Sequence, residues 1–403
     1  MKIIAICDTN PFFVSSAYAN RLAGLFKAVS SQIDEFKLYV LSPCSEMELR
    51  ENGLPEGLNG ICVSYLSKTI DSDKSLFGRI KNILLGKRLN SEQRIIIKKA
   101  YTENADVIWI AGGNAIRKAF LKNKKYITAT TMMEMSEYQQ LYKQEKMLFV
   151  QKLRFWLEYR TTCRALYNID ILAVMTKHLE QYYQSYTSPK TKYIHLPMTV
   201  DLSRFSDVVL RDLPYEKPYI AFTGTYTDLK DGVSILIESF ASIAEKYPTY
   251  KLYLAGFYNP DMEKQVQLIK DLGLENRVKH IGILDKSVIP TFVKNASLLV
   301  LSRPDSRQAQ GGFPTKLGEY LATGNPVCVT KVGEIPDYLE DNVSAFMADP
   351  GNVDSFADAL DRALRDEANA KRVGANGRKV AEENFDVEKQ AKRLSQFLID
   401  NLK

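Results

Sequence analysis

The sequence has few of the residues that usually hold metals or form disulfide frameworks. It contains three histidines (His178, His195 and His280), and none lies in a close cluster with cysteine, so a metal site is not expected. The five cysteines are odd in number, scattered and mostly within apolar runs. This usage indicates reduced core thiols in a cytoplasmic protein.

Long apolar runs are also absent, because no stretch approaches the length of a membrane span. Asp8 and Asn10 interrupt the N-terminal apolar run, so residues 2–7 are expected to form a first strand and not a signal peptide. No internal repeat or low-complexity tract is present. With 403 residues and 45% hydrophobic content, the chain is long enough for two domains of ordinary size.

The net charge of +6 is unevenly distributed. Residues 201–403 contain 26 basic and 30 acidic side chains, whereas residues 1–200 contain 28 basic and 18 acidic ones. The first half is therefore at +10, which indicates an anionic partner such as a membrane surface, a phospholipid-linked acceptor or nucleic acid. Nucleic acid is not expected, since no recognised binding module is present.

The clearest functional pattern lies between residues 297 and 330. The apolar run at 297–301 predicts a buried strand, and a polar loop ending in Gly311-Gly312-Phe313 follows it. A helix is predicted to begin at Pro314, which needs no N–H at a first helical position, and to stop at Gly324. A strand, a glycine loop and a helix N-terminus in this order are typical of a phosphate site.

Glu319 lies one turn beyond Thr315, where a carboxylate can accept hydrogen bonds from a ribose diol. On the local pattern alone two alternatives stay open, because paired glycines often form only a turn and an exposed helical glutamate is usually solvated. The segment GGFPTKLGEYLATGNPVCVT resembles the nucleotide-sugar motif of the family-4 glycosyltransferases, which have a GT-B fold. That family carries a pair of glutamates; Glu319 supplies the second, and Gly311 stands in place of the first. The resemblance implies that the donor is bound here by Gly311, Gly312, Phe313, Thr315, Lys316 and Glu319.

A second glycine turn, at Gly224, precedes a helix that Asp231 is expected to cap. The resemblance implies an arginine just after this glycine and a lysine five residues later. Lys230 matches that lysine, with an ordinary surface lysine as the alternative, and Thr225 stands in place of the arginine. Another cation is then needed beside the donor diphosphate. The remaining donor-binding candidates are Arg303 and Arg307 for that cation, Ile283 and Leu284 for the nucleobase, and Ser15 and Ser16 in place of a glycine-rich first loop.

The candidate catalytic residues are Glu134 and Glu137, in the acidic segment MMEMSEY at residues 132–138. We expect this segment to follow a strand at 126–129, and a helix would then place both carboxylates on one face. Related sequences carry a histidine or an acid in this region, so either glutamate is a candidate to orient or deprotonate the acceptor hydroxyl. The alternative is a solvated first helical turn, where acids are favoured in any case.

Alternation of apolar and polar runs predicts the other elements. In the second half, strand and helix alternate as a doubly wound sheet requires. Residues 68–104 are interpreted as basic and irregular. Strands are expected at 36–41, 106–111, 169–175, 219–223, 251–255, 277–281 and 327–330, and helices at 17–29, 141–167, 177–186, 232–246, 261–272, 286–294, 353–365 and 387–402.

The helix at 141–167 presents basic and apolar side chains on one arc. Lys143, Lys146, Arg154, Arg160 and Arg164 fall within about 120°, together with Val150, Leu153 and Leu157. Glu145 and Glu158 fall outside that arc, while Leu141, Leu148, Phe155, Tyr159 and Leu166 can pack on the core. This mixture suits an anionic bilayer surface, and the alternative is an ordinary solvated face.

Taken with the resemblance, the sequence predicts a GT-B protein with two Rossmann-like, doubly wound α/β domains facing across a cleft. The domains are expected at residues 1–199 and 200–386, with a terminal helix at 387–403 that packs back on the first. The resemblance implies a retaining, metal-independent glycosyltransferase that needs no cofactor and moves a sugar from a nucleotide-sugar donor to a glycan or lipid-linked acceptor. We expect it in the cytoplasm, on the inner face of the cell membrane. A non-catalytic nucleotide-sugar-binding subunit and a GT-B epimerase remain alternatives.

Overall fold

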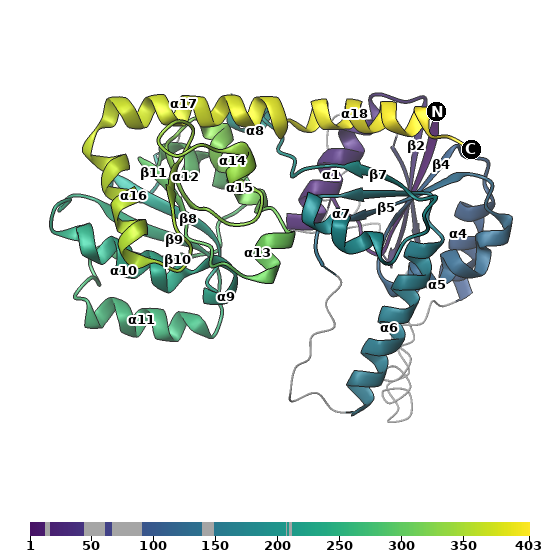
Figure 1. Ribbon diagram of the computed structural model, residues 1–403, viewed down its shortest axis with the longest axis horizontal. Coiled ribbons are helices and arrows are strands. Elements are labelled where there is room, and N and C mark those ends of the chain that lie inside the picture. Colours follow the sequence, from purple (N-terminus) through teal and green to yellow (C-terminus); the bar gives the residue numbers. More distant parts are fainter. Residues whose placement is uncertain (13–16, 44–60, 67–90, 139–148, 207, 209–211) are drawn as a thin grey trace. The chain divides into compact units, whose positions relative to one another are not determined.

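The computed structural model describes residues 1–12, 17–43, 61–66, 91–138, 149–206, 208 and 212–403 (Figure 1). The chain forms two compact units. Unit 1 comprises Met1–Leu196 together with Glu388–Lys403, and unit 2 comprises Pro197–Val387. The chain therefore passes from unit 1 to unit 2 after Leu196 and returns at Glu388.

Unit 1 is built on a parallel sheet with the strand order β3-β2-β1-β4-β5-β6-β7 in the part of the chain that the structure describes. Its central strands are almost wholly apolar, as strands covered on both faces must be. The strands are β1 (Lys2–Cys7), β2 (Glu35–Pro43), β3 (Ile61–Leu66), β4 (Val107–Ala111), β5 (Thr130–Met135), β6 (Ile171–Val174) and β7 (Lys192–His195). The helices are α1 (Ala17–Ser30), α4 (Ser91–Thr102), α5 (Asn114–Asn123), η1 (Lys124–Tyr126), α6 (Phe149–Tyr167), α7 (Lys177–Gln184) and α18 (Val387–Asp400).

Two predictions for unit 1 are wrong. The strand expected at 126–129 lies instead at β5, because η1 continues α5 through Tyr126, and all six residues of Thr130–Met135 are buried between β4 and β6. The segment 68–104 is not irregular throughout, since α4 occupies Ser91–Thr102 and buries Ile97 and Tyr101. The prediction missed this helix because the adjacent Lys98 and Lys99 were read as part of a basic segment, although α4 has one apolar face.

Unit 2 is a second parallel sheet, in the order β10-β9-β8-β11-β12-β13. Its predicted strand–helix alternation is confirmed, with boundaries that differ by up to three residues, whereas the strand at Phe346–Ala348 and the long helix at Glu367–Asn384 were not predicted. The strands are β8 (Tyr219–Thr225), β9 (Lys251–Phe257), β10 (Val278–Gly282), β11 (Leu298–Leu301), β12 (Val327–Thr330) and β13 (Phe346–Ala348). The helices are α8 (Ser203–Ser206), α9 (Asp228–Asp231), α10 (Val233–Ala244), α11 (Asp261–Asp271), α12 (Ile289–Asn295), α13 (Arg307–Gly311), α14 (Thr315–Thr323), α15 (Ile335–Tyr338), α16 (Val353–Arg365) and α17 (Glu367–Asn384).

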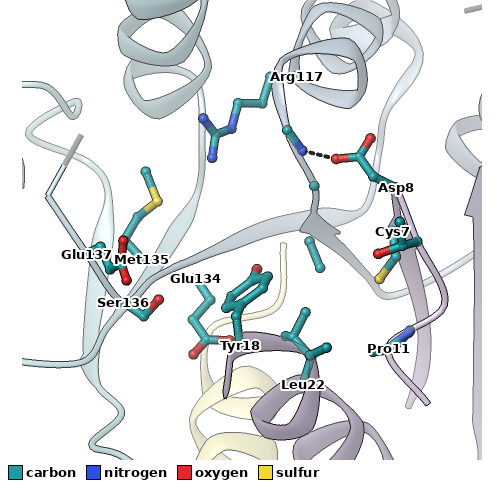
Figure 2. A pocket seen from close by; sticks show the side chains of 15 residues that line it. Cys7, Asp8, Pro11, Tyr18, Leu22, Arg117, Glu134, Met135, Ser136 and Glu137 are labelled. Carbon is teal, nitrogen blue, oxygen red and sulfur yellow. Dashed lines mark hydrogen bonds between the residues drawn. The ribbon is translucent and has the colours of Figure 1, made fainter. Parts of the chain in front are cut away.

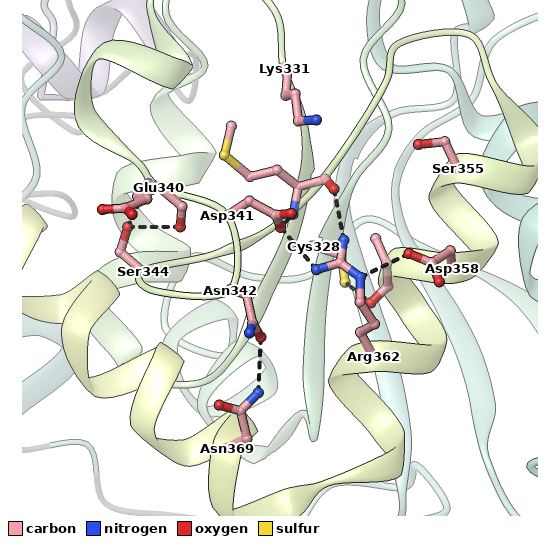
Figure 3. A network of polar contacts seen from close by, with 12 residues as sticks. Cys328, Lys331, Glu340, Asp341, Asn342, Ser344, Ser355, Asp358, Arg362 and Asn369 are labelled. Atoms are coloured by element: carbon pink, nitrogen blue, oxygen red, sulfur yellow. Dashed lines mark hydrogen bonds and ion pairs between the residues drawn. The ribbon is translucent and has the colours of Figure 1, made fainter.

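Arg362 fastens α16 to the edge of this sheet (Figure 3). Its guanidinium donates to Asp341 at 3.0 Å, to Asp358 at 2.8 Å and to the carbonyl oxygen of Met347 at 3.0 Å. Burial lowers the pKa of Arg362, but the two carboxylates outweigh burial and raise it overall. This network holds the edge strand β13 against α16. Two strands, β11 and β12, separate β13 from β8.

The helices that the structure describes do not combine the length and the apolarity that a membrane span needs. None of them is both long enough and apolar enough to cross a bilayer.

Candidate functional site

The sheet of unit 2 reverses its strand order between β8 and β11. From β8 the chain adds β9 and β10 on one side, and from β11 it adds β12 and β13 on the other. Open α/β sheets bind ligands outside the carboxyl ends of the strands at such a reversal. β8 ends in Gly224 and Thr225, and Ser302 and Arg303 follow β11 directly, so these residues mark the candidate site.

An ion pair that is largely shielded from solvent lies at the end of β8. Lys316, the second residue of α14, places Nζ 2.9 Å from Oδ1 of Asp231, and their side chains are 15% and 1% exposed. The ammonium also lies 4.6 Å from the centre of the Phe222 ring. Burial lowers the pKa of Lys316, Asp231 opposes that shift, and Arg303 and Lys230 add to it. Three cationic side chains therefore act on one another here.

Two glycines let the chain approach closely at this point. A Cβ on Gly224 would overlap Nζ of Lys316 and come within 3.2 Å of Oδ2 of Asp231. Gly232, between α9 and α10, has φ +63°, and a Cβ there would overlap the carbonyl oxygen of Ser302. A side chain at either position would move the groups that face the site.

The start of α14 differs slightly from the prediction. The helix begins at Thr315, and Pro314 precedes it as the N-cap in an extended conformation instead of forming its first residue. No side chain caps this end, so its first N–H groups point outward with the positive end of the helix dipole. Gly324 ends the helix with φ +76°, as predicted.

The polar segment before the glycines is not entirely a loop, which corrects a second expectation. Arg307–Gly311 form the short helix α13, because Oγ of Ser306 accepts a hydrogen bond from the backbone N–H of Ala309 at 3.1 Å. Gly311 is the last residue of α13 and is buried, while Gly312 follows as its C-cap. Arg307 lies at the start of this helix.

Phe313 is a packing residue. It is buried, and its ring contacts those of Tyr338 and Phe385 with centroid distances of 5.5 and 5.3 Å. It therefore anchors the segment between α13 and α14 on the core of unit 2, next to Gly312.

Glu319 lies one turn into α14, as predicted, and it has a partner that the sequence did not indicate. Nη1 of Arg204, in α8, donates to Oε1 of Glu319 at 3.0 Å. Both side chains are partly exposed, so a ligand can reach the carboxylate. Arg204 holds Glu319 in one orientation near the helix N-terminus.

The other predicted donor residues of unit 2 lie on the same edge of its sheet. Lys230 belongs to α9, and Nε of Arg303 donates to its carbonyl oxygen at 3.3 Å. Arg303 is itself only 4% exposed and therefore braces the turn that carries Lys230. Ile283, directly after β10, is exposed, and Leu284 follows it. The positions of Ser15 and Ser16 lie outside the described residues.

Unit 1 carries a pocket of about 440 Å³ at its own reversal of strand order, between β1 and β4 (Figure 2). Asp8 follows β1 and accepts a hydrogen bond from the backbone N–H of Gly113, which follows β4. Arg117 of α5 donates from Nη1 to Thr162 at 2.9 Å, and burial lowers its pKa. Tyr18 and the segment Glu134–Glu137 complete the wall.

The two predicted catalytic glutamates do not share a helix face, because Glu134 belongs to strand β5 and Glu137 follows it. Glu134 is buried and pairs with Arg21 of α1, whose Nε lies 2.6 Å from Oε1 of Glu134. Oε2 of Glu134, which lines the pocket, has no hydrogen-bond partner among the described residues. Nη2 of Arg21 also donates to the carbonyl oxygen of Leu196 at 2.8 Å.

Glu137 is tied to the pocket through its backbone. Its carbonyl oxygen accepts a hydrogen bond of 2.7 Å from the hydroxyl of Tyr183 in α7. This contact fixes the chain after β5 and leaves the carboxylate at the pocket wall.

Several residues of these sites were not expected from the sequence in the roles that they have, among them Arg117 and Tyr18 of the unit 1 pocket. Arg204 and Arg21 were not predicted, and Asp231 was expected only to cap the helix at 232–246, whose N-cap is Gly232. A signal existed for Arg21, which shares the buried stripe of α1 with Leu25 and Ala28 at helical spacing. Glu134 likewise interrupts an apolar strand, and two opposite charges inside two apolar runs suggest a buried pair.

The geometry of unit 2 agrees with a comparison against protein families. Residues 211–380 match the model of "Glycosyl transferases group 1". Most of unit 2 is thus similar to the group 1 glycosyl transferases. The resemblance identified from the motif is confirmed at this level, and the narrower assignment to family 4 is compatible with it.

Individual relatives of these glycosyl transferases cover part of the chain. The amylovoran biosynthesis glycosyltransferase AmsK of Erwinia amylovora is 27% identical over 205 residues, which are 50% of this chain and 49% of that protein. The chain thus matches about half the length of such curated relatives, or slightly less.

Solved structures of glycosyl transferases match nearly the whole chain. Sucrose-phosphate synthase from Thermosynechococcus elongatus has a TM-score of 0.72 at 16% identity and covers 99% of both chains. HepE of Anabaena in complex with UDP and glucose has a TM-score of 0.70 at 15% identity and covers 99% of this chain and 100% of its own. At such identities the likeness shows the fold, and the predicted GT-B fold with two Rossmann-like units is confirmed.

Proposed function

We propose that this protein is a glycosyltransferase that moves a sugar from a nucleoside diphosphate sugar to a hydroxyl acceptor, with retention at the anomeric carbon. The observation that carries the proposal is the group of side chains at the carboxyl ends of β8 and β11. An uncapped helix N-terminus, the ammonium of Lys316 and the carboxylate of Glu319 come from α14, and Lys230 comes from α9. The complex of HepE with UDP and glucose supports a donor of this class.

The chemistry follows from these charges. Transfer breaks the bond between the anomeric carbon and the diphosphate oxygen and forms one to the acceptor oxygen, whose proton is lost. Negative charge develops on the departing diphosphate, so fixed cations and backbone N–H groups lower the barrier most if they face it. Lys316, Lys230 and the first turn of α14 have that role in our proposal. That no metal or cofactor takes part stays a prediction.

The pocket of unit 1 is the proposed acceptor site. The partner-free Oε2 of Glu134 can accept a hydrogen bond from the acceptor hydroxyl and so orient it or take its proton. Nε of Arg117, buried at the same pocket and without a hydrogen-bond partner in the described part of the chain, can donate to another oxygen of the acceptor. A polyhydroxylated acceptor such as a glycan supplies both groups.

Donor binding tests the proposal through Glu319. We expect wild-type protein to bind one member of a panel of UDP-, GDP- and ADP-sugars, and Glu319→Gln to weaken that binding by about 1.5–3 kcal/mol, the scale of a hydrogen bond to a charged group. Isothermal titration calorimetry measures both. The matched control is Glu245→Gln, at an exposed glutamate after α10 in the same unit, which should bind the donor as wild type does. Unchanged affinity in Glu319→Gln would leave this carboxylate as a partner of Arg204 only.

Hydrolysis separates the enzyme from the non-catalytic alternative. A working glycosyltransferase slowly releases free sugar and nucleoside diphosphate when water replaces the acceptor. A binding subunit releases neither, and an epimerase converts the donor without releasing nucleoside diphosphate. Chromatography of the donor after overnight incubation distinguishes the three results.

We further propose that the acceptor is a lipid-linked or cell-surface glycan and that α6 attaches the protein to the inner face of the cell membrane. α6 extends from the sheet of unit 1 (Figure 1) and carries large exposed apolar side chains. Phe149 is 79% exposed and Trp156 is 45% exposed, with Leu153 and Leu157 beside them. Such side chains, with basic residues on the same helix, suit a bilayer interface.

The charges on α6 differ in one respect from the predicted arc. Arg154 pairs with Glu158 at 3.0 Å, so one predicted membrane contact is partly neutralised. Arg160 lies 4.6 Å above the ring of Trp156, and Arg164 is exposed. Of the residues predicted to pack on the core, Leu166 is buried, while Phe155 and Tyr159 are not fully buried. Lys143, Lys146, Glu145, Leu141 and Leu148, and the side chain of Val150, lie outside the described residues.

Vesicle binding tests this attachment. Wild-type protein should sediment with anionic vesicles at low salt and stay in solution with neutral ones. Replacing Arg160 and Arg164 by glutamate should abolish sedimentation, because roughly 1 kcal/mol of attraction is lost per basic residue near the surface and repulsion is added. The matched control reverses Lys264 and Lys270, exposed lysines of α11 in unit 2. Wild-type protein that ignores anionic vesicles would point to an acceptor free in solution.

A further inference from the structure

The ion pair between Lys316 and Asp231 is unusual for its position. Asp231 is buried and the Lys316 side chain is only 15% exposed, yet they lie at the carboxyl end of β8, where a ligand is expected, and not in the centre of unit 2. Replacing a buried ion pair by apolar residues is often neutral or stabilising, because two charges must be removed from water to form it. Stability therefore does not explain why the pair occurs here.

Asp231 is held through both its backbone and its carboxylate. Its N–H donates to the carbonyl oxygen of Thr227 at 2.9 Å, and its own carbonyl oxygen accepts from Oγ of Ser302 at 3.1 Å. Oδ1 faces Lys316 at 2.9 Å, and Oδ2 faces the backbone N–H of Thr225 at 3.4 Å. The carboxylate thus bridges the end of β8 and the start of α14.

The long side chain of Lys316 is held with equal precision. Its ammonium lies against Phe222, and against Gly224 where any side chain would displace it. Thr225, the next residue, occupies the place where the sequence resemblance implied an arginine. The cation missing from β8 is thus supplied by α14, 91 positions further along the chain.

We propose that Lys316 is the principal cation for the diphosphate of the donor, and that Asp231 is the positioning residue that holds its ammonium beside Gly224. This inference rests on the proposed function and adds to it the group that replaces the arginine. Lys230, in the same turn as Asp231, is then a secondary contact.

The pH dependence of binding follows from the charges around Lys316. These are Asp231 and Lys230 of α9 and Arg303 after β11; Phe222 of β8 is uncharged. Diphosphate binding needs the ammonium form, which exists below the pKa of Lys316 and is lost as the pH rises through it. Asp231 raises that pKa against burial and the two cations. Removing the carboxylate should therefore move the alkaline loss of binding to lower pH.

Calorimetry with UDP, GDP and ADP tests the inference, with uridine, guanosine and adenosine as ligands that lack phosphate. Lys316→Met and Asp231→Asn should weaken diphosphate binding about 10- to 100-fold and leave nucleoside binding unchanged. Lys230→Ala should have a smaller effect. Asp231→Glu should restore part of the affinity, and the alkaline limit of Asp231→Asn should lie below that of wild type. The matched control is Lys246→Met, which breaks the pair of the exposed Lys246 with the half-buried Asp361 in the same unit.

Gly224→Ala gives an independent test if Asp231→Asn does not fold. Its methyl group enters the space of the ammonium without removing a charge, so it should also weaken diphosphate binding. If Lys316→Met and Asp231→Asn bind the nucleoside diphosphate as tightly as wild type, the pair is structural and the inference is wrong, while the proposed function stands. If the wild type binds none of UDP, GDP and ADP, both fail.

Discussion

Glu134→Gln is expected to lower the release of nucleoside diphosphate from the donor by about 10²–10⁴-fold, the usual contribution of a positioned acid or base. The amide keeps the shape of the carboxylate and still faces Arg21, but it cannot take a proton from a hydroxyl. Donor binding should not change, because Glu134 belongs to unit 1 and the donor residues that the structure describes belong to unit 2.

Rates of release and calorimetric affinities, measured on the same protein, separate the two effects. Glu137→Gln is the matched control, because Glu137 lines the same pocket. The hydrogen bond from Tyr183 to Glu137 uses the backbone carbonyl oxygen, so this replacement does not remove it. Its rate should fall less than that of Glu134→Gln. A Glu134→Gln protein that releases nucleoside diphosphate at the wild-type rate would remove Glu134 from the mechanism, and a larger loss in Glu137→Gln would exchange the two roles.

Arg21→Met should destabilise unit 1 by about 3–5 kcal/mol, because it leaves the carboxylate of Glu134 buried without its partner. The side chains of Arg21 and Glu134 are 1% and 0% exposed. The double replacement Arg21→Met with Glu134→Leu removes both charges and should recover most of that loss. The exposed pair of Arg154 and Glu158 offers a contrast, since Arg154→Met should change stability by less than about 1 kcal/mol.

Urea denaturation followed by tryptophan fluorescence measures these changes in the stability of unit 1. The only two tryptophans of the sequence, Trp109 in β4 and Trp156 in α6, both lie in unit 1. The signal therefore reports the unit that contains Arg21. Equal urea midpoints of unfolding for Arg21→Met and wild type would contradict this prediction. They would mean that water or another cation stabilises the buried carboxylate of Glu134 when Arg21 is absent.

Five of the strands of unit 2, β8 to β12, could be predicted because each is a short apolar run followed by a polar turn, whereas β13, with three residues, was missed. β12 and α16 were predicted with the bounds that the structure has. β5 was misplaced because TATTMMEM mixes small, polar and apolar residues, and its strand character comes from burial between β4 and β6. Local propensity carries little information about a strand whose neighbours decide its environment.

In the candidate site too, features set by local sequence could be predicted, and contacts between distant residues could not. Glu319 and Gly324 follow from the periodicity of one helix. The pairing of Lys316 with Asp231 joins residues 85 positions apart, and that of Arg204 with Glu319 joins residues 115 apart. Such contacts arise from the order of strands in the sheet, which a pattern of single residues does not contain. The sequence shows which of these side chains are charged, but it does not show which of them pair.

The division of the chain has a consequence for synthesis. Unit 2 is one continuous segment, so it can fold on the ribosome as soon as Val387 has emerged. Unit 1 cannot be completed then, because Glu388–Lys403 belong to it, the N–H of Lys403 donates to Thr130 at the start of β5, and its ammonium pairs with Asp170 at 2.8 Å. The unit that is made first is thus completed only after unit 2 has been made, when Glu388–Lys403 pack on it.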